Sequence, residues 1–474
     1  MTQLKRTLCA FLVLGASFFV RGAVDIGDRR ELFVDDLLIG ELNGTHLKLH
    51  QPQRLERLPS RPYGHYATML KDGGLLRLYY RGDKVPDNHW SSGWGKWHEN
   101  EVTLYAESRD GGISWKKPNL GVHDVPAFPD GNVVIDIGPD TFMVAHNFTP
   151  FIDTCPGVPS GERYKAVGGG RYHNEHWPFW NPENEREQLL AKYGAGGLKA
   201  FVSPDGIHWK LLRKEPIIRE EQGYFDSQNV VFWSDAEQQY VCYLRDLRNQ
   251  LRSISRCTSK DFLHWTVPVP MEADQQNEHL YTNCTQPYFR APHIYLALPT
   301  RFGQEDTAIT DILFMATRPR QTRYHRHFKE AFIRPGLGER GWNNRANYLT
   351  LGVHQTTPTH LSLFMFGGSH YRLRLDGFVS VHAGYERGEF ITKPFEFSGE
   401  RLEINFSTSG AGRIGIELQT PDGDRLVKSV PLYGDEIGRV VKWVKSSTLR
   451  SHAGKPVRLR FVMNEADLYS IRFH

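Results

Sequence analysis

The sequence contains very little amphipathic helical pattern, which excludes the helical fold classes. The best helical candidate is residues 182–193, and this segment lies within a loop between strand-like stretches. A chain of 474 residues with 39% hydrophobic residues can still bury a large core. Since helices do not supply that core, strands must, and we predict an all-β protein with more than one domain.

Runs of like charge and metal-type cysteine or histidine spacings are also lacking. The formal net charge is +4 and no basic run stands out, which argues against nucleic acid as a partner. Beyond residue 23 the chain has an even number of cysteines, namely Cys155, Cys242, Cys257 and Cys284. The sequence leaves open whether Cys242 and Cys257 form a disulfide. An alternative is a metal site formed by four loop histidines, although their spacing matches no standard site. They are His89, His98, His173 and His176. We predict no metal and no cofactor.

One long apolar run occurs at the N-terminus, and no other follows it. Residues 1–23 begin with two basic residues, continue with an apolar run from Leu8 to Val20, and end in small residues. This is the layout of a signal peptide. The run is short for a membrane span and no second one follows. We therefore expect an exported protein, periplasmic or extracellular, without stable membrane insertion, and the sequence leaves its oligomeric state open.

One pattern recurs five times along the chain: polar residues stand before a buried strand, and a second strand follows. It is clearest in residues 224–233 and 239–246, and its copies begin near Tyr66, Asn147, Gln228, Thr282 and Asn347. The intervals suit blades of four antiparallel strands with variable loops. We predict a five-bladed β-propeller catalytic domain over residues 24–385, closed by an early strand containing residues 33–39. A β-sandwich domain follows over residues 386–474.

One turn carries the Asp-box pattern Ser-x-Asp-x-Gly-x-x-Trp, and two others are one-residue-shorter relatives of it. They begin at Ser108, Ser203 and Ser259. In such turns the aspartate accepts hydrogen bonds from turn amides and the tryptophan packs between blades. We predict that these residues are scaffold and take no part in catalysis.

The propeller topology brings strand-one entrances and strand-two exits to one face, where carboxylates gather. Asp226 and Glu278 stand at the entrances of adjacent inner strands, and Glu101 opens a strand in the first blade. Glycoside hydrolysis needs a carboxylic acid and a carboxylate roughly 5–10 Å apart. We predict that Asp226 and Glu278 are catalytic, with Glu101 as the third candidate. The alternative for each is a salt bridge with a neighbouring arginine.

The same face collects residues that suit a sugar. Four blades place an arginine at the exit of strand two: Arg81, Arg171, Arg245 and Arg301. Guanidinium groups bind carboxylates and sulfates through paired hydrogen bonds, which predicts an anionic substrate. The alternative is pairing with nearby acids: Asp83, Asp246, Glu305 and Asp306. The other predicted substrate-binding residues are His65, Asn147, Trp177, Gln228 and His279.

Several stretches resemble the five-bladed propeller glycoside hydrolases, the superfamily of families 32, 43 and 117, and especially exported bacterial family-32-N-terminal-domain-like proteins. They are Glu31-Leu-Phe-Val-Asp-Asp, Tyr105-Ala-Glu-Ser-Arg-Asp-Gly, Asn147-Phe-Thr-Pro-Phe, Glu278-His-Leu-Tyr-Thr-Asn, Leu375-Asp-Gly-Phe-Val-Ser-Val and Lys455-Pro-Val-Arg-Leu-Arg-Phe-Val. The resemblance implies a hydrolase with an acidic centre in a propeller pocket. The family-32 motifs Asn-Asp-Pro-Asn-Gly, Arg-Asp-Pro and Glu-Cys are not found, so no catalytic role transfers to a numbered residue.

These observations predict a glycoside hydrolase, exo-acting on an exported oligosaccharide or polysaccharide. Two alternatives remain open. One is a carbohydrate-binding propeller that has lost the acid–base pair. The other is a sialidase-like hydrolase of an acidic sugar, which requires three arginines to converge on one point.

Overall fold

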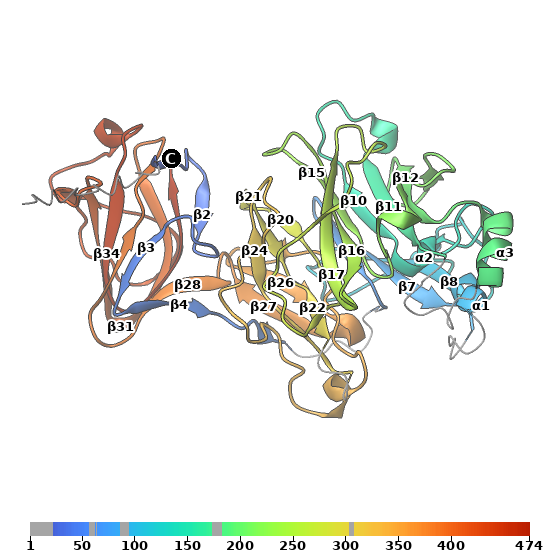
Figure 1. Cartoon of the computed structure of the whole chain (residues 1–474). Helices are drawn as coiled ribbons and strands as arrows, with labels where there is room; N and C mark the ends of the chain where they lie inside the picture. The colour runs from blue at the N-terminus through green and yellow to red at the C-terminus, as the bar shows by residue number, and fades with distance from the viewer. Residues whose placement is uncertain (1–21, 56–61, 63, 86–93, 173–182, 303–307) are drawn as a thin grey trace, which may run out of the picture.

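The computed structural model describes residues 22–55, 62, 64–85, 94–172, 183–302 and 308–474. Two bodies built from strands lie side by side, a propeller and a sandwich (Figure 1). The α-helices of the described ranges are α1 (Trp94–Glu99), α2 (Val144–Asn147) and α3 (Glu183–Tyr193). The all-β prediction is confirmed. No helix in these ranges is long and apolar enough to cross a membrane.

The first three blades are antiparallel sheets that follow chain order. Blade one contains β6 (Thr68–Asp72), β7 (Leu75–Asp83), β8 (Glu101–Ser108) and β9 (Val133–Ile135). Blade two contains β10 (Thr149–Ile152), β11 (Tyr164–Gly170) and β12 (Gly197–Ser203), with β13 (Lys210–Leu211) and β14 (Ile218–Arg219) both pairing with β12. Blade three contains β15 (Val230–Ser234), β16 (Gln239–Arg248), β17 (Leu251–Ser259) and β18 (Val269–Pro270).

The last two blades are less regular. Blade four is split between β20 (Gln286–Tyr288), β21 (Ala291–Ala297) and β24 (Met315–Thr317), and β19 (His279–Leu280), β22 (Thr300–Phe302) and β23 (Thr310–Ile312). Blade five contains β25 (His354–Gln355), β26 (His360–Phe364) and β27 (His370–Arg374), with β5 (Gln53–Arg54) as its outer strand. The chain therefore closes the ring with an early segment, as propellers require to avoid an open edge.

The inner strands surround one axis. β6 contacts β10, β10 contacts β15, and β15 contacts β20. Leu351, from blade five, forms a parallel bridge with Thr68 of blade one, which completes a ring of five. Across the axis, the side-chain amide of Gln228 donates to Thr68 Oγ1 at 2.8 Å. The prediction of five blades is confirmed.

The sandwich is organised around two long strands, β31 (Leu402–Gln419) and β34 (Arg458–Phe473). Their partners are β28 (Val379–Ala383), β29 (Gly388–Thr392), β32 (Arg425–Lys428), β33 (Asp435–Val440), and three strands from the N-terminal region, β2 (Arg30–Leu32), β3 (Ile39–Asn43) and β4 (Thr45–Leu49). β1 (Val24–Asp25) pairs with β30 (Phe395–Glu396). In Figure 1 the blue N-terminal strands lie among the orange and red C-terminal ones.

The prediction that residues 33–39 close the propeller is wrong. β2 pairs with β34, and β3 pairs with β29, so this segment belongs to the sandwich. Phe33 packs edge-on against Phe390 with ring centroids 5.3 Å apart. Apolar alternation tells which face of a strand is buried but does not name the sheet that buries it. The predicted boundary after residue 385 differs for the same reason, because residues 379–383 also pair within the sandwich.

The Asp-box turns behave as scaffold, as predicted. Asp110 Oδ1 accepts from the amides of Ile113 and Ser114 at 3.0 and 2.9 Å, and the Trp115 indole donates to Gly112. The turns at Ser203 and Ser259 repeat this arrangement. These contacts hold the loop between the third and fourth strands of blades one, two and three.

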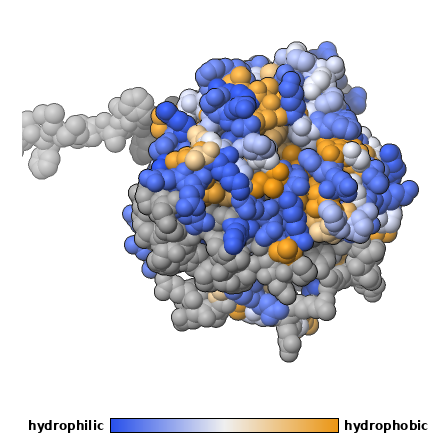
Figure 2. Space-filling model, turned by 90° about the vertical axis from the view of Figure 1, so that its right-hand side faces the viewer, coloured by the Kyte–Doolittle hydropathy of each residue, from blue (hydrophilic) through white to orange (hydrophobic). Residues whose placement is uncertain are grey.

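The surface at the propeller end is mostly hydrophilic (Figure 2), and the cysteine thiols of the described ranges are free. Seen from the propeller end, hydrophilic side chains dominate the face and apolar ones form small groups between them (Figure 2). Cys242 and Cys257 lie directly opposite each other on β16 and β17, and both thiols are free.

Candidate functional site

Glu101 lies at the centre of a buried charged cluster. It opens β8 and is 0% exposed. His146 Nδ1 lies 2.8 Å from its Oε1, and His98 Nδ1 lies 2.8 Å from its Oε2. Arg81 lies 3.2 Å from Oε1. Burial raises the pKa of Glu101, but His146, His98 and Arg81 outweigh it and hold the pKa well below its usual range. Glu101 is therefore a charged anchor rather than a proton donor.

Short helices bring the two histidines to Glu101. α1 ends just before β8 and supplies His98, while α2 supplies His146 directly before the first strand of blade two. α2 is preceded by Met143 in the left-handed region, at φ 61°. Its neighbour Phe142 stacks on Tyr193 of α3 at 4.6 Å and meets His98 edge-on. The predicted helix in residues 182–193 is thus present and supports the histidine cluster from behind.

His146 is held in its protonated form. Burial lowers the pKa of His146, but the carboxylates of Glu101 and Asp226 outweigh it and raise the pKa to about 9. Arg81 NH1 also lies 2.9 Å from Nδ1. We assign the Nδ1 proton to the bond with Glu101, since a carboxylate accepts from both cations and a protonated imidazole accepts from neither.

Asp226 is the carboxylate of this cluster that reaches solvent. Its side chain is 51% exposed, and its Oδ1 lies 3.4 Å from His146 Nε2. It follows Phe225, whose φ of 54° is unusual for an aromatic residue. Burial raises the pKa of Asp226, but His146 and the guanidinium of Arg245 lower it further, below its usual range. At neutral pH His146 is therefore the imidazolium and Asp226 the carboxylate of an ion pair.

Tyr281 lies among three guanidinium groups. Those of Arg245, Arg252 and Arg345 lie 5.0, 4.9 and 5.8 Å from its ring centroid. Burial and Asp226 raise the pKa of Tyr281, but the three arginines outweigh them and lower it below its usual value. Tyr281 packs edge-on against Tyr348, with ring centroids 5.5 Å apart. A tyrosine whose pKa is lowered by neighbouring cations is a candidate nucleophile.

The four predicted exit arginines do not meet at one point. Arg81 binds Glu101, and Arg171 lies over the Tyr224 ring at 4.9 Å. Arg301 binds Asp311 through two nitrogens, at 2.9 and 2.6 Å. Arg245 is the one that reaches Tyr281, donating to its carbonyl at 2.7 Å. The predicted structural alternative therefore holds for Arg301, although its partner is a carboxylate on the next strand.

Sequence reasoning missed His98 as a Glu101 partner, and also Tyr281, Arg252 and Arg345. The repeat pattern contained a usable signal for Tyr281, because it directly precedes Thr282 as His146 directly precedes Asn147. Arg345 stands two residues before Asn347, as Asp226 stands two before Gln228. Equivalent entrance positions therefore supply four of the groups at this site.

The other predicted binding residues have structural contacts. Asn147 binds the Gly169 backbone and the Phe225 carbonyl, and Gln228 spans the axis. His65 stacks on Phe366 at 4.2 Å, and burial lowers its pKa to about 3. His279 Nδ1 accepts from the Arg252 amide at 3.0 Å, and burial and Arg252 lower its pKa to about 4. Trp177, His89, His173 and His176 lie outside the described residues.

Glu278 lies in a different environment from Asp226. It forms ion pairs with Arg326 and, at 3.5 Å, with Arg301. It lines a cavity of about 1200 Å³ together with Asp311 and Lys329. Within the described ranges no hydrogen bond or ion pair joins Glu278 to Asp226. The carboxylate linked to Asp226, through His146, is Glu101.

We expect Glu278→Gln to destabilise the fold by about 2–4 kcal/mol with little change in kcat, because it strips a buried guanidinium of its charge partner. The Arg326 side chain is only 2% exposed. Chemical denaturation and steady-state kinetics measure the two effects. Asp274→Asn, which breaks an exposed pair with Lys329 in the same cavity, is the control and should leave stability nearly unchanged. A large loss of kcat in stable Glu278→Gln protein would restore Glu278 to the mechanism.

The buried cluster has the donor atoms of a metal site, but a neighbouring guanidinium already balances its negative charge. The ligand atoms of His98, Glu101 and His146 lie within 4.8 Å of one another. Arg81 already supplies a positive charge 3.2 Å from Glu101. A cation at this point would be repelled by that guanidinium, so we assign no metal here.

No protein-family model and no curated protein sequence matches this chain. Among solved structures, it is similar to a family 43 arabinoxylan arabinofuranohydrolase from Bacillus subtilis, at 12% identity over 87% of this chain and 96% of that one, with a TM-score of 0.39. An exo-beta-1,3-galactanase from Phanerochaete chrysosporium matches at 12% identity over 90% and 99%, with a TM-score of 0.39. A family 32 beta-fructofuranosidase from Bombyx mori matches at 10% identity over 89% and 94%, with a TM-score of 0.41. Similarity this loose carries no information on activity.

Proposed function

We propose that this chain is an exo-acting glycoside hydrolase for a sugar that carries an anionic group, such as a uronic acid or a sulfated sugar. The observation that carries the proposal is the convergence of Arg245, Arg252 and Arg345 on Tyr281 beside the solvent-reaching Asp226. Three guanidiniums around one point suit a single charged residue at a chain end. The leader-like residues 1–23 support an exported, periplasmic or extracellular enzyme.

In the proposed mechanism, Tyr281 and the Asp226–His146 pair divide the chemistry. The Tyr281 phenolate attacks the anomeric carbon, the glycosidic C–O bond breaks, and the leaving oxygen takes the proton of the His146–Asp226 ion pair. Water then attacks the glycosyl-tyrosine, returns a proton to the pair and releases the phenolate. Tyrosine nucleophiles are known among glycosidases, and two displacements at one carbon retain its configuration.

Glu101 acts through His146 in this scheme as a positioning residue. Its Oε1 accepts a hydrogen bond from the Nδ1–H group of His146 at 2.8 Å, and this orients Nε2 towards Asp226. Because it keeps His146 protonated, it also sets the pH at which the pair can no longer deliver a proton. Arg81 balances the buried charge of Glu101.

We expect kcat/KM to fall as pH rises through about 9, where His146 loses its proton. The folded pKa lies above the unfolded value of about 6.5, so the stabilising charge is complete below pH 6.5 and is lost as pH approaches 9. Glu101→Gln removes the largest cause that raises this pKa, and the alkaline limb should move about 1–2 pH units towards neutral. Glu107→Gln, near the other end of β8, is the matched control. An unmoved limb in folded Glu101→Gln protein would contradict this assignment.

A carbohydrate-binding propeller is the second candidate, and a specific observation favours it. Glu101 is fully buried and Glu278 is ion-paired, so Asp226 is the carboxylate of the described cluster that is open to solvent. A binding protein needs the arginines but not the His146–Asp226 ion pair.

The two candidates differ in whether product forms. The untagged protein would be incubated with oligosaccharides ending in uronic acids, sulfated sugars or neutral sugars, with products followed by mass spectrometry and anomeric NMR. We expect release of single acidic residues with retained configuration. Binding of an acidic sugar by calorimetry without product would favour the second candidate, and neither binding nor product would reject both.

A further inference from the structure

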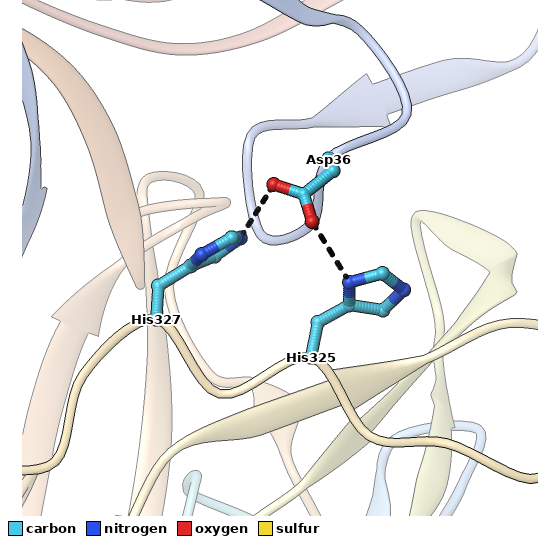
Figure 3. A group of neighbouring side chains, drawn as sticks. All are labelled: Asp36, His325 and His327. Carbon is cyan, nitrogen blue, oxygen red and sulfur yellow. Dashed lines mark ion pairs between the residues drawn. The ribbon is translucent and has the colours of Figure 1, made fainter. Parts of the chain in front are cut away.

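Asp36, His325 and His327 come together where the sandwich meets the propeller (Figure 3). Asp36 follows β2 in the N-terminal part of the sandwich, and the two histidines follow β24 of blade four. Asp36 Oδ2 lies 3.5 Å from His325 Nδ1, and Oδ1 lies 3.5 Å from His327 Nε2. With one ligand atom taken from each residue, all three lie within 4.8 Å of one another.

The spacing is longer than that of a direct histidine–carboxylate hydrogen bond and close to that of the His50–Asp467 and His146–Asp226 ion pairs, at 3.6 and 3.4 Å. His293 lies 2.9 Å from Glu31, and His264 lies 2.7 Å from Asp261. Bonds of about 2.0–2.1 Å to a tetrahedral metal place neighbouring ligand atoms about 3.3 Å apart. The 3.5 Å separations at Asp36, one from each carboxylate oxygen, are compatible with ligand spacing.

The backbone that carries the histidines is fixed. The His325 amide and carbonyl both bond to Ala316, at 2.7 and 3.1 Å, and Tyr324 donates to Glu272 at 2.7 Å. In extended chain, alternate side chains share a face, so His325 and His327 project together. Arg326 between them turns the other way, to Glu278. The His-x-His sequence thus presents two imidazoles on one face.

The aspartate is held by its neighbours as well. Asp35 binds Arg318 of blade four, and its Oδ1 also accepts from the Leu37 amide at 3.0 Å. Lys393 donates to the Asp36 carbonyl at 2.6 Å. These contacts fix the turn without using the Asp36 carboxylate, which is 61% exposed. The histidine side chains are 18% and 25% exposed, so an ion can enter without any opening of the fold.

We propose that Asp36, His325 and His327 form a binding site for a divalent transition metal, Zn²⁺ above all, which clamps the sandwich to the propeller. Two imidazoles and one carboxylate suit zinc, cobalt and nickel better than calcium or magnesium, which prefer oxygen ligands. Water completes the coordination. The ion joins segments about 290 residues apart in sequence, and the site is independent of the proposed glycosidase activity.

The test uses the full-length mature chain without an affinity tag, stripped with chelator and titrated with ZnCl₂ by calorimetry. We expect one high-affinity site per chain, a rise in Tm with Zn²⁺, and no such effect of Ca²⁺ or Mg²⁺. His327→Gln and Asp36→Asn should each weaken Zn²⁺ binding at least tenfold and abolish the rise in Tm. His264→Gln, which removes a surface histidine next to a single aspartate, is the matched control and should bind like the parent.

Two outcomes would overturn the assignment. One is the absence of stoichiometric Zn²⁺, Co²⁺ or Ni²⁺ binding to the folded parent. The other is unchanged affinity in both His327→Gln and Asp36→Asn, which would place the ion elsewhere in the chain. Both substitutions lie at exposed positions, and Tm in chelator shows whether each variant is folded.

Discussion

Replacing Asp226 with asparagine is expected to lower kcat by about 10²–10⁴-fold, because the amide can neither pair with the His146 imidazolium nor take up its proton. The side chain is half exposed and Glu101 still pairs with His146, so stability should fall less than in Glu278→Gln. Steady-state kinetics on an acidic oligosaccharide and thermal unfolding measure the two quantities. Loss of kcat with KM nearly unchanged separates a chemical role from a binding role.

Asp235→Asn is the matched control for this experiment. Asp226 precedes β15 and Asp235 follows it, so the two aspartates lie at opposite ends of one strand. Asp235 accepts a hydrogen bond from the Trp233 indole and belongs to the opposite face. Its variant should keep the parent rate. If Asp226→Asn also turns over at the parent rate, Asp226 is not part of the reaction.

The fold was predictable to the extent that it repeats. Strand-one and strand-two patterns recur in every blade, so the number of blades followed from the sequence. The N-terminal strands do not repeat, and their partners lie more than 300 residues away: β2 pairs with β34, and β5 with β27. An apolar pattern such as that of residues 31–39 specifies a buried face but not which of two sheets will bury it.

The sequence predicted which residues stand at the entrances of strands, but it did not predict which side chains pair with them. Asp226 and Glu101 were predicted as candidates because each stands at the entrance of a strand. Glu278 occupies a comparable entrance, yet Arg326, 48 residues later, binds its carboxylate. The partners of the arginines at strand exits were not predicted either, since Arg301 binds Asp311 on the neighbouring strand. Ion pairs between strands require the register of both, which the sequence alone does not contain.

Removing the negative charge from the substrate is expected to lower kcat/KM by about 10²–10³-fold, through carboxyl reduction or desulfation of the charged sugar. Charge-assisted hydrogen bonds contribute about 1.5–3 kcal/mol each, and a factor of 100 needs about 2.7 kcal/mol. Arg245 lies with Arg252 and Arg345 around Tyr281, so these guanidiniums can supply bonds of this kind to a charged sugar.

The arginines and the substrate charge can be tested against each other. Arg345 is exposed, so Arg345→Gln should fold normally and lower kcat/KM for the charged substrate while leaving the neutralised one unaffected. Arg301→Gln is the control, because Asp311 already neutralises that guanidinium, and it should discriminate between the two substrates as the parent does. Equal loss on both substrates would show that Arg345 acts without regard to charge. Parent enzyme that cleaves both substrates equally fast, with no rise in KM for the neutral one, would remove the anionic group from the specificity of this site.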